Sequence, residues 1–316
     1  MALDLHQHLW TEPFVAALTK RASPPRLRRV DTEWVLALPG EPRCVLQLPD
    51  DADARVDQAH ADGIDRIVIA PSSPLGIEGL PPDKARELID AYDRGVDELD
   101  PLRFAAWGTV PLREIDPVDV DVALARGRVG LCLPSGALAT LEALERVGPV
   151  LERLAQRDAP LFVHPGPAPW GPAARPLSGV NTRSWWPALV DYTASLNAAW
   201  HAWMAAGRDA HPTLRVVFAA LAGGAPLHLE RLAQRAGPGL AASAAEDPRV
   251  FYETSSYGSL ALAAVAGAVG AQQLVFGSDA PYAAPHVLDG ERGRQLSTDN
   301  PARLFARATT PQEIPA

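Results

Sequence analysis

Three histidines and one aspartate have the types and positions of metal ligands. His6 and His8 stand two residues apart at the end of an apolar run, so on a β-strand both imidazoles face the same side. His164 and Asp279 each close another apolar run farther along the chain. Imidazole nitrogens and carboxylate oxygens bind Zn²⁺ in proteins, and the ion makes its water acidic enough to ionise near neutral pH. The four residues therefore predict a centre for one divalent ion.

Each of these ligands also has an ordinary structural alternative. Paired histidines pack in protein cores, His164 can bond to a neighbouring backbone carbonyl, and Asp279 can serve as a turn residue before Pro281. Because all four close expected strands, one shared site explains them better than four separate coincidences.

The elements that must position these residues alternate along the chain. Eight short apolar, β-branched runs are expected as strands, at 2–6, 66–70, 104–110, 129–133, 160–164, 214–220, 250–254 and 273–278. Periodic segments are expected as helices, at 83–99, 141–157, 186–206, 225–235, 259–269 and 300–306. This alternation predicts an α/β protein with a parallel sheet, and eight units in 316 residues predict a (β/α)8 TIM barrel. A doubly wound open sheet is the alternative.

Two connections exceed the usual length: 8–50 after the first strand and 165–185 after the fifth. Both follow the carboxyl ends of strands, where barrel enzymes carry their active sites, so we expect long loops that shape a pocket. No linker divides the chain, and residues 1–316 are expected to form a single domain.

Composition excludes several classes of partner. The formal net charge is −9, which argues against nucleic-acid binding, and no apolar run is long enough to cross a membrane. The start MALDLHQHLW does not read as a secretion signal, so a cytoplasmic location is expected. Cys44 and Cys132 lack the spacing of a thiolate zinc site, and Cys132 is expected as a buried thiol.

Several motifs together resemble the amidohydrolase superfamily. They are DLHQHLW, FVHPGP, the Gly-Gly turn at 223–224, VFGSDAP and NPARLF. The resemblance is to the amidohydrolase-related branch, which includes aminocarboxymuconate-semialdehyde decarboxylase and resorcylate-type decarboxylases. It implies that His6, His8, His164 and Asp279 bind one divalent metal ion, zinc first and manganese or iron as alternatives. It also implies that Asp279 is catalytic and transfers protons.

The chain departs from this family at one position. Ala220 stands where a histidine usually ends the sixth strand, and alanine can neither act as a base nor stabilise an oxyanion. His201, His228 or His286 could take its place in space. Superfamily members with two metals bridge them through a carbamylated lysine, but Lys20 and Lys84 are the only lysines and neither lies near a strand end. A mononuclear site is therefore expected.

The substrate pocket is expected to draw on aromatic and polar residues after the strands. The expected substrate contacts are Trp10, Trp170, Arg183, Trp185, Trp186, Tyr257 and His286. Glu253, at the end of the seventh strand, could orient a ligand histidine, or it could simply start a helix or lie on the surface.

Three functions fit these residues. The first expectation is a hydrolase, in which a metal-activated water attacks a C–N or C–O bond of a small organic molecule. The alternative is a non-oxidative decarboxylase of an aromatic or unsaturated acid, in which Asp279 protonates carbon. The third is a barrel that binds a small molecule without turnover, because Ala220 replaces the usual base. A homo-oligomer is compatible with the family resemblance.

Overall fold

The computed structural model describes residues 1–171, 185–283 and 290–306. Eight short parallel strands lie at its centre, and each overlaps one of the expected strand regions. They are β1 (Leu3–Gln7), β5 (Arg66–Ile69), β6 (Phe104–Ala106), β7 (Leu131–Pro134), β8 (Leu161–His164), β9 (Val216–Phe218), β10 (Val250–Glu253) and β11 (Leu274–Val275). They form one sheet in the order β1-β5-β6 and a second in the order β11-β10-β9-β8-β7. The expectation of an α/β protein with parallel strands is confirmed.

Backbone hydrogen bonds join the two sheets at both pairs of edges. Between β6 and β7, the Gly108 amide donates to the Gly130 carbonyl (2.9 Å), and the Cys132 amide donates to the Gly108 carbonyl (2.7 Å). Between β1 and the chain after β11, the Leu5 amide donates to the Phe276 carbonyl at 3.1 Å. The segments that directly follow β6 and β11 therefore hydrogen-bond to the facing edges of the other sheet.

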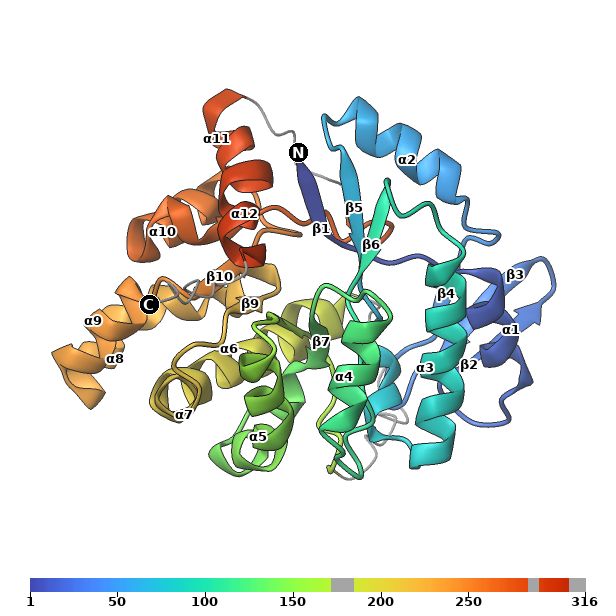
Figure 1. Cartoon of the computed structure of the whole chain (residues 1–316), viewed down its shortest axis with the longest axis horizontal. Coiled ribbons are helices and arrows are strands. Elements are labelled where there is room, and N and C mark those ends of the chain that lie inside the picture. The colour runs from blue at the N-terminus through green and yellow to red at the C-terminus, as the bar shows by residue number, and fades with distance from the viewer. Residues whose placement is uncertain (172–184, 284–289, 307–316) are drawn as a thin grey trace, which may run out of the picture.

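Helices surround these strands (Figure 1). Those that follow the strands in the chain are α3 (Pro82–Asp97), α4 (Val118–Ala125), α5 (Leu141–Gln156), α6 (Tyr192–Ala202), α7 (Arg208–Ala210), α8 (Leu229–Ala236), α9 (Pro238–Glu246), α10 (Ser259–Val269), α11 (Gly290–Arg294) and α12 (Asn300–Phe305). In α5, the side-chain oxygen of Thr140 caps the amino end, and Val147, Leu151 and Leu154 lie buried on one face. Among the described helices, none combines the length and apolar character needed to cross a membrane.

The connection after β1 is not the long loop that the sequence analysis expects. It contains α1 (Glu12–Lys20), an antiparallel sheet of β2 (Arg26–Val30), β3 (Glu33–Ala37) and β4 (Cys44–Leu46), and then α2 (Ala52–Ala61). A two-residue turn with Asp31 at a φ of 53° joins β2 to β3. The arginines of β2 conceal its alternation, because only Leu27 in that strand is buried. Figure 1 shows α1 and this small sheet together at one side, beside α3. Of the second expected loop, residues 172–184 lie outside the described chain.

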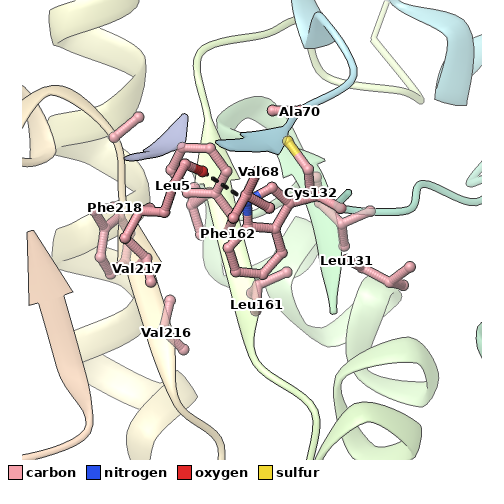
Figure 2. Packing of buried hydrophobic residues seen from close by; sticks show 14 of the residues in the cluster. Leu5, Val68, Ala70, Leu131, Cys132, Leu161, Phe162, Val216, Val217 and Phe218 are labelled. Carbon is pink, nitrogen blue, oxygen red and sulfur yellow. Dashed lines mark hydrogen bonds between the residues drawn. The ribbon is translucent and has the colours of Figure 1, made fainter. Parts of the chain in front are cut away.

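The interior between the strands is filled with apolar side chains. Figure 2 shows Leu5, Phe162 and Phe218 packed together there, all with no exposed surface. The indole N–H of Trp107 donates to the Leu5 carbonyl at 2.9 Å, so this large side chain is fixed in the core. The ring of Phe162 lies 5.0 Å from the ring of His6, edge to face. The core thus forms the floor beneath the residues of the predicted metal site.

Candidate metal centre

The carboxyl ends of three strands bring the four predicted ligands together. His6 lies in β1 and His8 directly follows it, His164 ends β8, and Asp279 follows β11. One donor atom from each residue lies within 4.8 Å of the others, and this group could hold a metal ion. Oδ1 of Asp279 is 3.4 Å from Nε2 of His6 and 3.2 Å from Nε2 of His8, and the two imidazole nitrogens are 3.2 Å apart.

Backbone carbonyls orient two of the imidazoles. Nδ1 of His8 donates to the Ala70 carbonyl at 2.9 Å, and Nδ1 of His164 donates to the Pro165 carbonyl at the same distance. Since a carbonyl can only accept, each bond leaves the lone pair of a neutral ring on Nε2. Both histidines are buried. The residues therefore present preset nitrogen donors, as metal-binding histidines do.

Glu253 stands behind the third imidazole. Its carboxylate is fully buried and accepts hydrogen bonds from the Ala220 amide (3.0 Å), the Ser255 amide (2.6 Å) and the Ser255 hydroxyl (2.9 Å). Oε2 of Glu253 also lies 3.3 Å from Nδ1 of His6, at ion-pair distance but without hydrogen-bond alignment. A Cβ atom at Gly277 would lie 2.3 Å from Oε1 of Glu253, so the glycine of the VFGSDAP motif makes room for this carboxylate.

The electrostatics of the cluster favour a cation. Burial disfavours a charged His6, but Asp279 and Glu253 raise the pKa of His6 to about 9. Burial, together with the neighbouring His6 and His8, holds the pKa of His164 well below its usual value. Burial opposes ionisation of Asp279, yet the surrounding histidines lower the pKa of this carboxyl. The carboxylates of Asp279 and Glu253 therefore favour a positive charge within this cluster.

The donor set fits a divalent ion. Metal bonds of 2.0–2.1 Å in a tetrahedral site place neighbouring donors roughly 3.3 Å apart. The three separations among His6, His8 and Asp279 are 3.2, 3.2 and 3.4 Å. The Asp279 side chain keeps 22% of its surface exposed, whereas the three histidines are almost completely covered. One side of the centre is therefore open at the aspartate.

Two of the expected substrate contacts, Trp10 and Trp170, are held by hydrogen bonds through their indole N–H groups. The Trp10 indole is buried and donates to the hydroxyl of Tyr282 at 3.0 Å, and the Tyr282 ring lies 5.5 Å from the His8 ring. The Trp170 indole donates to the Leu112 carbonyl at 2.6 Å, and the Arg146 guanidinium lies 4.6 Å from the centre of the Trp170 ring. That face of Trp170 is therefore covered by an arginine.

The remaining expected contacts lie elsewhere or outside the described chain. Trp185 and Trp186 are 48% and 42% exposed, with ring centres 5.8 Å apart. Tyr257 is half-buried against the core, and burial raises the pKa of its hydroxyl. Arg183 and His286 belong to segments outside the described residues.

The end of β9 carries no imidazole. Ala220, Leu221 and Ala222 adopt left-handed φ angles of 46°, 51° and 55°, and Gly223 and Gly224 continue this conformation. His201 and His228 lie 6.0 Å from each other, and neither belongs to the group of four ligands. What the backbone offers at this point is the Ala220 amide, which donates to Glu253.

A cavity of about 650 Å³ is lined by residues that follow β7 and β8 and by parts of the insertion after β1 and of α6, but by none of the four candidate ligands. Its wall includes Trp170, Tyr192 and Glu41, and also Gly166, two residues after His164. The Tyr192 hydroxyl donates to both carboxylate oxygens of Glu41, at 2.8 and 2.7 Å. Burial raises the pKa of Tyr192, and the charges of Glu41 and Asp279 raise it further. The Tyr192 hydroxyl therefore lies in the cavity wall and is close enough to Asp279 to feel its negative charge.

The sequence analysis misses several residues around the centre. Tyr282 follows the VFGSDAP motif directly, and Glu41 and Tyr192 approach from the insertion after β1 and from α6. Asp4, two residues before His6, accepts hydrogen bonds from both ligand-bearing segments. The position of Asp4 on the strand of the HxH motif is the one signal that could have singled it out.

The resemblance to the amidohydrolase-related branch is confirmed at the level of the fold. The chain is similar to IDCase from Metarhizium anisopliae, with a TM-score of 0.78, 17% identity, and 96% of this chain and 97% of that chain covered. It is similar to 5-carboxyvanillate decarboxylase LigW from Sphingomonas paucimobilis, with a TM-score of 0.73, 18% identity and coverages of 96% and 98%. A third similar structure is 5-carboxyvanillate decarboxylase from Novosphingobium aromaticivorans, complexed with manganese and 4-hydroxy-3-methoxy-5-nitrobenzoic acid (TM-score 0.70, 17% identity, 96% of each chain). No protein-family model and no curated protein matches the chain.

The expectation of a hydrolase is wrong. The similar structures include decarboxylases of an aromatic acid, and these cover almost the whole of both chains. Three imidazoles and a carboxylate serve either reaction, so the ligand motifs by themselves could not distinguish a hydrolase from a decarboxylase.

Proposed function

We propose that the chain is a metal-dependent decarboxylase of aromatic carboxylic acids. The observation that carries this proposal is the buried group of His6, His8, His164 and Asp279, set in a fold shared with decarboxylases over 96% of the chain. We further infer that the eight parallel strands close into one (β/α)8 barrel and form a single domain. The hydrogen bonds at both pairs of sheet edges support this closure.

The ligands would hold one divalent ion, with zinc and manganese as the candidates. The nitrogen-rich set with one carboxylate suits zinc. Manganese is favoured by its presence in the similar structure from Novosphingobium aromaticivorans. When bound, the ion supplies a Lewis acid that can hold the substrate carboxylate and a neighbouring oxygen.

Asp279 is the proposed proton donor. In the net reaction R–CO₂⁻ + H⁺ → R–H + CO₂, the electrons of the broken C–C bond stay on the ring carbon and form a C–H bond there. Asp279 is the ligand that reaches solvent, so it can take up a proton and deliver it on the open side of the centre. The histidines are covered and already bonded through Nδ1 or placed against Glu253, which makes them holders of the metal.

The substrate ring would lie between this open side and the cavity. Tyr282 offers an aromatic edge near His8, and Tyr192 with Glu41 forms a polar wall. The buried core beneath Phe162 excludes water from the opposite side of the cluster. Such a setting would let the protonated carbon face Asp279 while the ring extends toward the cavity.

The proposal is tested by metal content and product on the same samples. The protein purified without chelators should contain close to one equivalent of metal, and it should release CO₂ from some members of a panel of hydroxybenzoic acids. His164→Ala should lose both the metal and the activity, because one ligand of four is removed. His60→Ala is the matched control, since His60 bonds to Arg103 away from the centre.

Two outcomes would overturn the proposal. Full metal content in His164→Ala would show that His164 is not a ligand. Metal-dependent binding of aromatic acids without CO₂ release, across the whole panel, would indicate a binding protein without turnover.

A further inference from the structure

Asp4 joins the two segments that carry the metal ligands. Its side chain is buried, and Oδ1 accepts hydrogen bonds from the amide of His6 (3.1 Å) and the amide of Ser278 (3.0 Å). His6 is itself a ligand, and Ser278 directly precedes the ligand Asp279. One carboxylate oxygen therefore fixes the distance between the histidine strand and the aspartate segment.

The backbone makes such a bridge necessary. Asp279 has a left-handed φ of 57°, so the chain bends away from the regular path of β11. Backbone bonds continue on either side of this bridge. Before it, the Leu5 amide donates to the Phe276 carbonyl at 3.1 Å; after it, the Asp279 amide donates to the His6 carbonyl and the His8 amide donates to the Ala280 carbonyl, both at 2.8 Å. The Ser278 amide lies between these bonds, and a side chain supplies its acceptor.

The second oxygen of Asp4 is held in turn. Oδ2 accepts from the Gln7 amide group at 2.8 Å, and the Gln7 oxygen faces the Arg55 guanidinium at 3.4 Å. Arg55 pairs with Asp50 at 2.9 Å, and Asp50 accepts from the Trp10 amide at 3.1 Å. This chain of polar contacts restrains the orientation of Asp4, so its carboxylate can act as a rigid spacer.

We propose that Asp4 is a positioning residue for the metal centre, which sets the separation between the His6–His8 pair and Asp279 and thereby the affinity and ligand geometry of the bound ion. This inference rests on the proposed function. Residues that orient metal ligands through such contacts typically change metal affinity about 10–100-fold when they are removed. Asp4→Ala should therefore bind the ion about 10–100-fold more weakly.

The conservative substitution provides a rescue test. Asp4→Asn keeps an oxygen at the Oδ1 position, which can still accept from both backbone amides, so most of the affinity should be retained even though its NH₂ group replaces the Oδ2 acceptor of the Gln7 side chain. Asp4→Ser is polar but too short to reach both donors, and it should behave like Asp4→Ala. The matched control is Asp65→Ala, because Asp65 accepts the Ala2 amide at 2.7 Å at the other end of β1.

The experiment measures metal affinity and ligand geometry separately from activity. Dissociation constants for Zn²⁺ and Mn²⁺ are obtained by competition with a chelator, well below the unfolding temperature of every variant. The visible spectrum of the Co²⁺-loaded protein reports the ligand field, which a purely structural role of Asp4 would leave unchanged. We expect weaker binding and a shifted spectrum for Asp4→Ala and Asp4→Ser, and near-normal values for Asp4→Asn and Asp65→Ala.

The outcomes distinguish the two proposals. Wild-type affinity and spectrum in Asp4→Ala, or in Asp4→Ser if the alanine variant does not fold, would overturn the positioning role. An equal loss in Asp65→Ala would do the same, since it would reflect general destabilisation of β1. If the wild-type chain itself takes up no metal, the proposed function fails first.

Discussion

Glu78 is a buried carboxyl group that does not belong to the four candidate metal ligands. It lies in a 3₁₀ turn, Ile77–Gly79, after β5, and only 1% of it is exposed. Oε1 accepts from the Thr109 hydroxyl at 2.8 Å, while Oε2 has no hydrogen-bond partner among the residues that the structure describes. Burial raises the pKa of Glu78 from its ordinary value of 4.5 to about 7. The folded protein therefore holds this proton more tightly than the unfolded chain does.

The size of the effect follows from the shift in pKa. A rise from 4.5 to about 7 corresponds to roughly 3 kcal/mol, since one pKa unit is about 1.4 kcal/mol. The contribution of Glu78 to stability is fully present below pH 4.5, where both states are protonated. It is lost as the pH rises from 4.5 to about 7, because the unfolded state then releases the proton and the folded state does not. Above this range the loss is complete.

Glu78→Gln should remove this pH dependence. The amide cannot ionise, and its oxygen can still accept from the Thr109 hydroxyl. The free energy of unfolding is measured by urea denaturation between pH 4 and pH 8.5 for both proteins. The difference between variant and wild type should change by about 3 kcal/mol in favour of the variant across this range, whatever its value at pH 4. Glu114→Gln, at an exposed glutamate, is the control.

A difference that stays constant with pH would refute this reasoning. It would mean that Glu78 titrates alike in the folded and unfolded states, so that water reaches the Oε2 atom. An equal change in Glu114→Gln would instead attribute the effect to the net charge of the protein.

Two further predictions concern the centre. Asp279→Asn keeps the side-chain shape but has no carboxyl proton to donate, so CO₂ release should fall about 10²–10⁴-fold while the three histidines still take up some metal. Metal content and activity are compared on the same samples. Unchanged turnover would exclude a catalytic role for Asp279. Gly277→Ala places a Cβ atom 2.3 Å from Oε1 of Glu253, so stability should fall by about 1–3 kcal/mol and metal affinity with it. Gly148→Ala, with open space around its Cβ position, is the control in thermal unfolding, and equal midpoints for both variants would contradict the close packing at Glu253.

The strands of this fold can be predicted from sequence because parallel strands covered on both faces read as continuous apolar runs. Their ends are less predictable, since they depend on partners far along the chain. The expected strand 273–278 ends after Val275, where the Phe276 amide turns to the Leu296 carbonyl at 2.9 Å. The small sheet after β1 escapes prediction because arginines fill β2 and weaken its apolar alternation.

The grouping of the four candidate ligands can be predicted for a related reason. A residue that closes a parallel strand must lie at the same edge as the ends of the neighbouring strands, whatever the connections between them. The loop structures are therefore not needed to predict that donor atoms of four residues lie within 4.8 Å of one another, those of His6, His8, His164 and Asp279. Residues such as Tyr192 and Glu41, which enter from a helix and an insertion, depend on packing that no local pattern reveals.

At position 220 this chain has alanine where the resembled family usually has a histidine. Considered alone, this substitution only removes a base, but the structure shows a further role for the backbone here. In the structure, the three non-glycine residues at 220–222 are left-handed, a conformation that costs about 1–2 kcal/mol per residue, and it persists where surrounding contacts impose it. Here the Ala220 amide donates to Glu253, and the backbone at Gly223 passes so close to Thr193 that a Cβ atom would lie 2.4 Å from its carbonyl oxygen. Glu253 in turn stands 3.3 Å from the ring of His6, so the segment without an imidazole still acts on the metal centre through its backbone.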